Sequence, residues 1–330
     1  MAESSPFSWK VLRLVFPIPE STESAGIQNL PLTVTIPEAP STGAVESAPD
    51  PQTEASPVIL FFSGFKLKAA YYSKYAQGLA AQGYAVVQYD TPFLKLPNDA
   101  TEVAWLPGLL SWLQAQTQDD SSPLHRRLDL ARIGTAGHSR GGKLAALHIA
   151  GNSQISAAYL IDPVDNTSQT PESAEYPSAC KALQGIDKPA AITGAGIGGP
   201  CNPEGSNSPV FFGAVNPGSW YMTVLGAGHA SFFKAPWLIQ KAADFLCHRG
   251  KESHEATVSL AIAPMLAWFG RHLKRSGDER QAQDKFFEWI KREEQAGRVS
   301  FQDVTGAKSL NANFLSRQGL NSMPYAPPGR

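Results

Sequence analysis

Short apolar runs alternate with amphipathic stretches over most of this chain. In the clearest run, residues 58–62, every position is apolar, and Ser63-Gly64 follows directly. A run that is apolar on both faces is typical of a central strand in a parallel sheet, because helices cover both sides of such a strand. Comparable segments predict further strands at residues 10–16, 30–36, 84–89, 132–136, 156–161, 189–193 and 220–225.

Helical spacing of apolar residues appears between and after most of these strands. It predicts helices over residues 71–82, 103–117, 142–149, 236–246 and 258–273. Strands that alternate with helices in this way imply a mostly parallel central sheet with helices on both faces. The fold class predicted from the pattern is therefore α/β.

One internal loop and the end of the chain depart from the alternation. Residues 37–57 are dense in Pro, Ser, Ala, Glu and Thr, which predicts a flexible surface loop. Residues 278–294 predict a charged, solvated helix, and the last residues predict a loose tail. We expect one α/β domain over residues 1–275, followed by a helical extension and tail over residues 276–330.

Composition and charge narrow the class of protein. The 330 residues are 42% hydrophobic and 17% charged, which is enough apolar material for a buried core. The formal net charge of -1 provides no strong attraction for nucleic acid. No apolar stretch reaches the roughly 18 residues of a transmembrane helix, and residues 1–20 lack the pattern of a secretory signal. A small-molecule reaction is the expected function.

The cysteines are Cys180, Cys201 and Cys247, too few and too widely spaced to indicate a disulfide framework or a zinc site. A bridge between Cys180 and Cys201 would close an internal loop, but the favoured interpretation is unpaired, partly buried thiols. No metal and no cofactor are expected.

The segment Gly137-His138-Ser139-Arg140-Gly141 matches the G-x-S-x-G pattern of a nucleophile elbow. A predicted strand precedes it and a predicted helix follows, which is the context that gives the pattern meaning. The turn between them is so tight that small residues must flank the serine. The pattern predicts Ser139 as the nucleophile, with its hydroxyl presented at the start of the helix.

A serine hydroxyl needs a base to accept its proton. His229 is the histidine expected to do so, because it lies in the glycine-bearing loop after the predicted strand 220–225. Most other histidines lie in or beside predicted helices. His138 adjoins the nucleophile, but the turn should direct it away, so packing is its expected role.

The acid that orients the base should lie between Ser139 and His229 in the chain. Asp162 is preferred because it directly follows the predicted strand 156–161, and the Gly-rich segment after strand 189–193 holds no carboxylate. Asp165 is the second choice and Glu204 a distant third.

An oxyanion hole requires two N–H groups directed at the developing negative charge. The backbone N–H of Arg140, directly after the nucleophile, is one expected donor. The loop Ser63-Gly64-Phe65 follows strand 58–62, and the N–H of Phe65 is the second expected donor.

Four segments, in order, resemble the chlorophyllase family of serine esterases. AGHSRGGK at residues 136–143 looks like its lipase-type signature, and residues 63–73 resemble its oxyanion-loop region. DPVD at residues 162–165 resembles the segment with the catalytic acid, and PCNPEGSN at residues 200–207 resembles the loop before the last strands. The likeness runs from about residue 58 to residue 246.

The resemblance implies an α/β-hydrolase fold and cofactor-free hydrolysis of the ester between phytol and the chlorophyll macrocycle, with Ser139, Asp162 and His229 as the triad. It also implies chlorophyll or a related phytylated pigment as substrate and a chloroplast location, associated with the thylakoid. Peripheral membrane contact is compatible with such a substrate. Two features depart from the family, which usually has histidine at Ser63 and acidic residues within 230–233.

A porphyrin ring with a long isoprenoid chain needs a wide apolar cleft. Phe65 and Phe232 are the residues expected to contact it. Two other functions stay open at this point. One is a lipase, or an esterase related to platelet-activating-factor acetylhydrolase, acting on another apolar ester. The other is a non-catalytic pigment or lipid carrier built on a hydrolase scaffold.

Overall fold

The structure, a computed structural model, describes residues 7–20, 22, 24–38, 55–274 and 279–304. Within them, strands form one sheet in the order β1-β2-β4-β3-β5-β6-β7-β8-β9. The six strands from β4 to β8 in this order run parallel, whereas β1, β2 and β9 are antiparallel to their neighbours. The expectation of a mostly parallel sheet is confirmed.

Every predicted strand is present, and one further strand follows late in the chain, after the last predicted helix. The strands are β1 Ser8–Pro17, β2 Asn29–Glu38, β3 Ser56–Phe62, β4 Ala85–Tyr89, β5 Leu128–His138, β6 Ile155–Ile161, β7 Ala190–Ile197, β8 Trp220–Gly228 and β9 Val299–Asp303. The helices are η1 Ala69–Tyr72, α1 Ser73–Ala80, α2 Asp99–Ala104, α3 Leu106–Gln118, α4 Arg140–Gly151, α5 Ala179–Gln184, α6 Ser208–Ala214, η2 His229–Phe232, α7 Trp237–Leu246, α8 His254–Leu273 and α9 Glu279–Gln295.

Strand β3 shows why its sequence has no polar face. All of its residues are buried, and successive side chains point to opposite sides of the sheet. Leu60 and Phe62 belong to one apolar cluster, whereas Ile59 and Phe61 belong to a second cluster on the other side. Both faces of the strand are therefore covered by helices.

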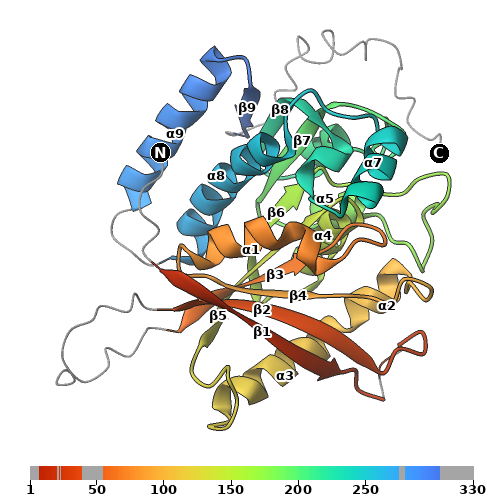
Figure 1. Ribbon diagram of the computed structural model, residues 1–330, viewed down its shortest axis with the longest axis vertical. Coiled ribbons are helices and arrows are strands. Elements are labelled where there is room, and N and C mark those ends of the chain that lie inside the picture. The colour runs from red at the N-terminus through yellow and green to blue at the C-terminus, as the bar shows by residue number, and fades with distance from the viewer. Residues whose placement is uncertain (1–6, 21, 23, 39–54, 275–278, 305–330) are drawn as a thin grey trace, which may run out of the picture.

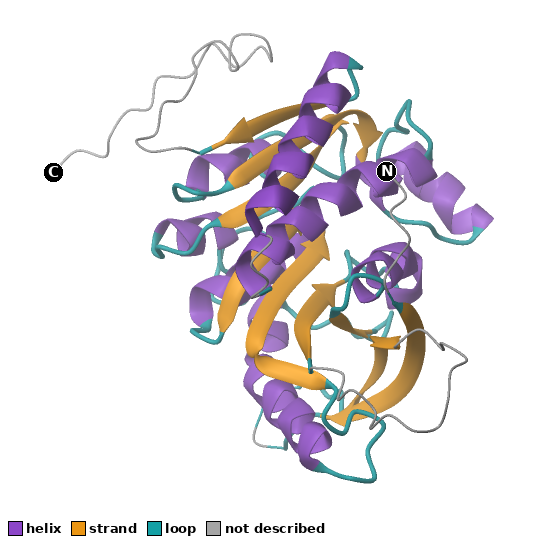
Figure 2. Cartoon of the chain, turned by 90° about the vertical axis from the view of Figure 1, so that its left-hand side faces the viewer, coloured by secondary structure: helices purple, strands orange, loops and turns teal. Residues whose placement is uncertain are grey.

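The two clusters correspond to two helical layers. Helices α3, α4, α5 and α6 pack on one face of the sheet, and α1, α8 and α9 pack on the other. Figure 2 shows the twisted sheet with helices on either side. Among the described helices, none is long and apolar enough to cross a bilayer.

The C-terminal extension adds to the same sheet. The charged helix predicted at residues 278–294 is α9, and β9 after it pairs antiparallel with β8. The ring of Phe286 on α9 stacks on Trp220 of β8, with 4.9 Å between ring centroids. The domain boundary at residue 275 stays a prediction. Most of the predicted loop 37–57 and the final tail lie outside the described residues.

Candidate active site

Ser139 occupies a sharp turn between β5 and α4. Its φ of 59° and ψ of -126° are unusual for a residue with a side chain. The neighbouring glycines make the turn possible: a Cβ on Gly137 would lie 2.2 Å from the Gly141 carbonyl oxygen, and one on Gly141 would lie 2.1 Å from the Phe62 oxygen. The spacing of glycines in the motif thus follows from steric exclusion on both sides of the serine.

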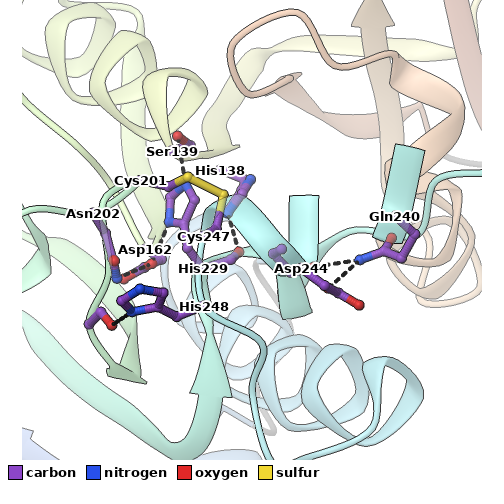
Figure 3. Close-up of a disulfide and its surroundings, with 12 residues drawn as sticks. His138, Ser139, Asp162, Cys201, Asn202, His229, Gln240, Asp244, Cys247 and His248 are labelled. Carbon is purple, nitrogen blue, oxygen red and sulfur yellow. Dashed lines mark hydrogen bonds and ion pairs between the residues drawn. A yellow bond between two sulfur atoms is a disulfide. The ribbon is translucent and has the colours of Figure 1, made fainter. Parts of the chain in front are cut away.

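The three residues expected to form a triad lie within hydrogen-bond distance of one another (Figure 3). His229 Nε2 is 2.9 Å from Ser139 Oγ, and His229 Nδ1 is 2.6 Å from Asp162 Oδ2. Asp162 is fully buried, whereas Ser139 retains 9% exposure. The outermost member of the row is therefore the serine. Their catalytic roles remain a prediction.

Asp162 stands at the end of β6 with a left-handed φ of 37°. Its Oδ1 accepts from the Ala195 N–H at 2.9 Å and from Ser208 Oγ at 3.3 Å. Its Oδ2 accepts from Asn202 Nδ2 at 3.0 Å in addition to its contact with His229. Four partners on two oxygens fix the carboxylate in the orientation that holds the imidazole.

The other two carboxylates considered as the acid lie elsewhere. Asp165 Oδ2 accepts from Ser178 Oγ at 2.7 Å, and its Oδ1 accepts from the Ala179 N–H at 3.0 Å. It therefore caps the start of α5, and its Oδ1 is 3.6 Å from Lys143 Nζ. Glu204 is exposed on the surface. Of the three, Asp162 is the one that contacts His229.

Arg140 is the first residue of α4, so its backbone N–H has no carbonyl of the helix to bond. Its side chain turns to α2, where Nε lies 2.8 Å from Asp99 and Nη1 lies 2.6 Å from Glu102. Burial opposes the charge, but Glu102 and Asp99 outweigh it and raise the pKa of Arg140. The side chain anchors the elbow and leaves the N–H as the group available near Ser139.

Phe65 lies in a tight turn after β3, closed by the Leu67 N–H donating to the Gly64 oxygen at 3.0 Å. Its side chain is 56% exposed, and Lys66 Nζ lies 5.4 Å from its ring centroid. Both roles predicted for Phe65, N–H donor and substrate contact, remain predictions.

The expectation that Phe232 contacts substrate is wrong for this conformation. The side chain is fully buried, and its ring centroid lies 5.9 Å from that of His138. The segment after His229 forms the 3-10 helix η2, which directs this ring inward. Phe232 therefore packs in the core beside His138.

His138 forms a buried contact that the motif alone did not reveal. Its Nδ1 lies 2.8 Å from Tyr72 Oη and its Nε2 lies 3.1 Å from the His229 carbonyl oxygen. The rings of His138 and His229 are 4.6 Å apart between centroids. Complete burial, together with the nearby His229, lowers the pKa of His138 well below its usual value, so the ring is neutral.

The favoured interpretation of three unpaired thiols is wrong. Cys201 and Cys247 form a disulfide, while Cys180 is a buried free cysteine (Figure 3). The sulfurs come together because the loop after β7 passes the end of α7, a proximity that spacing in sequence does not reveal. Cys201 directly precedes Asn202, so the disulfide lies beside a residue that donates a hydrogen bond to Asp162.

Known protein families and known proteins include several that resemble this chain. A family model described as Chlorophyllase matches residues 27–302. Chlorophyllase-2 of Arabidopsis thaliana is 27% identical over 59% of this chain and 67% of the relative. "Chlorophyllase-1, chloroplastic" of Citrus unshiu is 28% identical over 60% of this chain and 63% of the relative. The matches thus span about two thirds of these relatives.

A solved structure shares the fold. A ferulic acid esterase from Streptomyces cinnamoneus aligns with a TM-score of 0.59 and 20% identity, covering 92% of this chain and 98% of that chain. At this identity the likeness shows the fold alone, which is that of the α/β-hydrolases. The family match supports a carboxylic-ester hydrolase.

Proposed function

The chain belongs to the chlorophyllase family, and on that premise we propose that it is a serine carboxylic-ester hydrolase that cleaves chlorophyll into chlorophyllide and phytol. The observation that carries the proposal is the hydrogen-bonded row from Asp162 through His229 to Ser139. The names of the relatives support the pigment substrate.

The first half of the reaction acylates the enzyme. His229 Nε2 accepts the proton of Ser139 Oγ as this oxygen attacks the ester carbonyl carbon. Asp162 holds Nδ1–H and stabilises the imidazolium that forms. The N–H groups of Arg140 and Phe65 stabilise the oxyanion of the tetrahedral intermediate. When the intermediate collapses, His229 gives the proton to the phytyl oxygen, and phytol leaves.

The second half repeats the chemistry with water. His229 removes a proton from a water molecule, which attacks the acyl carbon bound to Ser139. The new intermediate collapses, Ser139 Oγ regains its proton from His229, and chlorophyllide leaves as the carboxylic acid. Each catalytic group returns to its starting state, and the reaction needs no cofactor.

The same family membership supports a chloroplast location associated with the thylakoid. Two relatives carry "chloroplastic" in their names. Measuring where a fluorescent fusion of the full-length protein accumulates in a plant cell tests this part of the proposal. Accumulation outside the plastid contradicts it.

The experiment that tests the activity is incubation of the purified protein with chlorophyll in detergent. Chlorophyllide lacks the phytyl chain and separates into the polar phase. We expect Ser139→Ala to reduce turnover by about 10⁶-fold, the size of loss seen when a triad nucleophile is removed. Wild-type protein that forms no chlorophyllide contradicts the proposal.

Two parallel measurements separate the alternatives. Turnover of nitrophenyl esters without pigment hydrolysis indicates a lipase or an esterase of the platelet-activating-factor acetylhydrolase type. A fluorophosphonate probe should label wild-type protein at Ser139 and leave Ser139→Ala unlabelled. No labelling of folded wild-type protein indicates a non-catalytic carrier.

A further inference from the structure

Helix α7 (Trp237–Leu246) turns its apolar side outward. None of its residues is buried. Its large apolar side chains are exposed by 65% at Trp237, 72% at Leu238, 43% at Ile239, 84% at Phe245 and 61% at Leu246. A helix of a globular protein normally directs such a face to the core.

The polar side of α7 faces the protein and holds the helix in this orientation. Gln240 Nε2 donates to the Ala230 oxygen at 3.1 Å, and Gln240 Oε1 accepts from the Ala235 N–H at 3.0 Å. Asp244 Oδ1 accepts from Gln240 at 3.1 Å (Figure 3). The disulfide of Cys247 fixes the end of the helix. These contacts hold α7 with its apolar side chains directed outward.

Single exposed apolar residues are ordinary on protein surfaces, but five on one ten-residue helix form a patch that marks an interaction site. Water makes this exposure unfavourable by an amount proportional to the apolar area. A partner that accepts apolar side chains would therefore stabilise the patch.

Charges around the helix indicate what the partner is. Residues 234–251 carry four basic residues and one acidic residue, although the whole chain has a formal net charge of -1. Lys241 Nζ lies 4.3 Å from the Trp237 ring, so this ammonium group sits at the border of the apolar face. Arg249 is exposed beyond the helix, and Lys234 before it lies 3.6 Å from Glu255. Apolar side chains bordered by cations suit an anionic lipid surface.

A second exposed apolar patch lies at the same edge of the sheet. Phe65, Phe93 and Leu94, in the loops after β3 and β4, are 56%, 61% and 92% exposed. Lys66 Nζ lies 4.9 Å from the Phe93 ring and borders this patch as Lys241 borders the first.

One hydrogen bond joins the segment just before α7 to the segment that follows the Phe65 loop. The Lys234 N–H, just before α7, donates to the Tyr71 oxygen of η1 at 3.0 Å. Strands β3, β4 and β8 are part of the parallel block that also includes β5, so the loops after them leave the edge where Ser139 lies. Figure 1 shows α7 and α2, which follows the loop with Phe93, on one side of the molecule.

We propose that α7, together with the loop tips at Phe65, Phe93 and Leu94, docks the protein on anionic lipid membranes. The docked face lies at the Ser139 edge, so an ester held in the membrane reaches the nucleophile without crossing water. This last step rests on the proposed function, whereas the docking itself does not.

Vesicle flotation tests the docking directly. Wild-type protein is mixed with phosphatidylcholine vesicles that contain or lack phosphatidylglycerol, and the bound fraction is measured. We expect binding that is at least tenfold stronger with the anionic lipid, and a loss of at least tenfold in the double variant Leu238→Gln/Phe245→Gln. Wild-type protein that binds neither vesicle overturns the proposal.

The matched control is Val11→Gln/Val15→Gln on β1, at the far end of the sheet order, where the side chains are 44% and 57% exposed. It changes the same number of exposed apolar residues to the same polar one and should bind like wild type. Equal losses in both double variants overturn the assignment to α7. Light scattering that reveals a dimer, broken by Leu238→Gln/Phe245→Gln in the absence of vesicles, assigns the face to a second copy and also overturns it.

Activity on a soluble nitrophenyl ester separates this inference from the proposed function. All of these variants should retain wild-type turnover of that ester in vesicle-free buffer, which also confirms that they fold. If wild-type protein binds vesicles but hydrolyses no ester, the proposed function fails and the docking surface stands. If it hydrolyses the ester but binds no vesicle, the docking surface fails and the esterase activity stands.

Discussion

At the scale of single residues, the buried hydrogen bonds of His138 determine which of its two ring nitrogens carries the hydrogen. The His229 carbonyl can only accept, so His138 Nε2 carries the hydrogen and Nδ1 accepts from the Tyr72 hydroxyl. Tyr72 Oη in turn accepts from the Gly64 N–H at 3.2 Å. This chain of hydrogen bonds connects the loop of the expected oxyanion donor to the backbone of the expected base, so both loops hold a common position.

Removing the Tyr72 hydroxyl should disturb that position. In Tyr72→Phe, the Gly64 N–H and His138 Nδ1 lose their partner, and a buried polar group without a partner costs about 1–3 kcal/mol. We expect kcat to fall about tenfold, the equivalent of about 1.4 kcal/mol, with little change in KM. Steady-state kinetics on a soluble ester checks this.

The control is Tyr75→Phe. Tyr75 is also fully buried beside Tyr72, but its hydroxyl has no hydrogen-bond partner in the described part of the protein. Its loss should leave kcat unchanged. Equal effects of the two substitutions would mean that Tyr72 acts through packing alone.

The choice of acid gives a second test at this scale. Asp162→Asn should lower kcat by about 10⁴-fold, because an amide stabilises the wrong tautomer of the histidine and cannot stabilise its cation. Asp165→Asn changes a helix cap, so its effect should appear mainly as lower stability. Comparison of kcat for the two variants shows which carboxylate orients His229. A larger loss of kcat in Asp165→Asn would assign this role to Asp165.

At the scale of elements, the disulfide joins two segments that surround the site. Cys201 lies in the loop after β7, next to the Asn202 side chain that bonds Asp162. Cys247 is the C-cap of α7, and its carbonyl oxygen approaches Gly199 in that same loop. The disulfide thus restricts the movement of both Asn202, which bonds Asp162, and helix α7.

Loss of the bridge should lower both stability and activity. The two cysteines are 46 residues apart, and closing a loop of this size stabilises the fold by about 4 kcal/mol in the chain-entropy model. We expect Cys201→Ser/Cys247→Ser to unfold at lower urea concentration and to show a reduced kcat. Cys180→Ser, at the buried free cysteine, is the control. A double variant as stable as wild type would contradict the expectation.

At the scale of the whole molecule, buried histidines connect stability to pH. Burial lowers the pKa of His148, which stacks on Phe62, to about 3. Burial also lowers the pKa of His272, beside Trp268, to about 4. Both rings are neutral in the folded protein over a range in which the unfolded chain protonates its histidines.

The sign of the effect follows from proton binding. Between pH 6.5 and about 3, the unfolded chain binds a proton that folded His148 does not, so the free energy of unfolding falls as pH falls. One such group contributes a slope of up to about 1.4 kcal/mol per pH unit. Urea unfolding of wild type and His148→Leu from pH 7 to pH 5 should give a shallower slope for the variant, with exposed His248→Leu as control. Equal slopes for wild type and His148→Leu would contradict this.

Much of this architecture could be predicted from the sequence, because fully apolar strands and a nucleophile elbow are local patterns. The order of Ser139, Asp162 and His229 was likewise predictable from the strand ends. The disulfide was not, because it depends on the folded proximity of two loops. Periodicity predicted a helix over residues 236–246 but cannot reveal which of its faces meets the protein.

The strand β9 was missed for a related reason. It is short, follows a charged helix, and among its residues only Val299 is buried. Its strand structure comes from the edge that β8 offers, with Val224 opposite Val299 and Trp220 opposite Asp303. Pairing between distant segments has no signature within five residues.

That added strand determines how short a working fragment could be. A chain ending at residue 275 would leave the β8 backbone groups opposite β9 without partners and would uncover the Trp220 ring that Phe286 stacks on. An open strand edge beside a bare indole invites pairing with other molecules and aggregation. His229 directly follows β8, so frayed backbone there would also displace the base. We therefore expect the smallest fragment that keeps this fold to extend at least to Asp303.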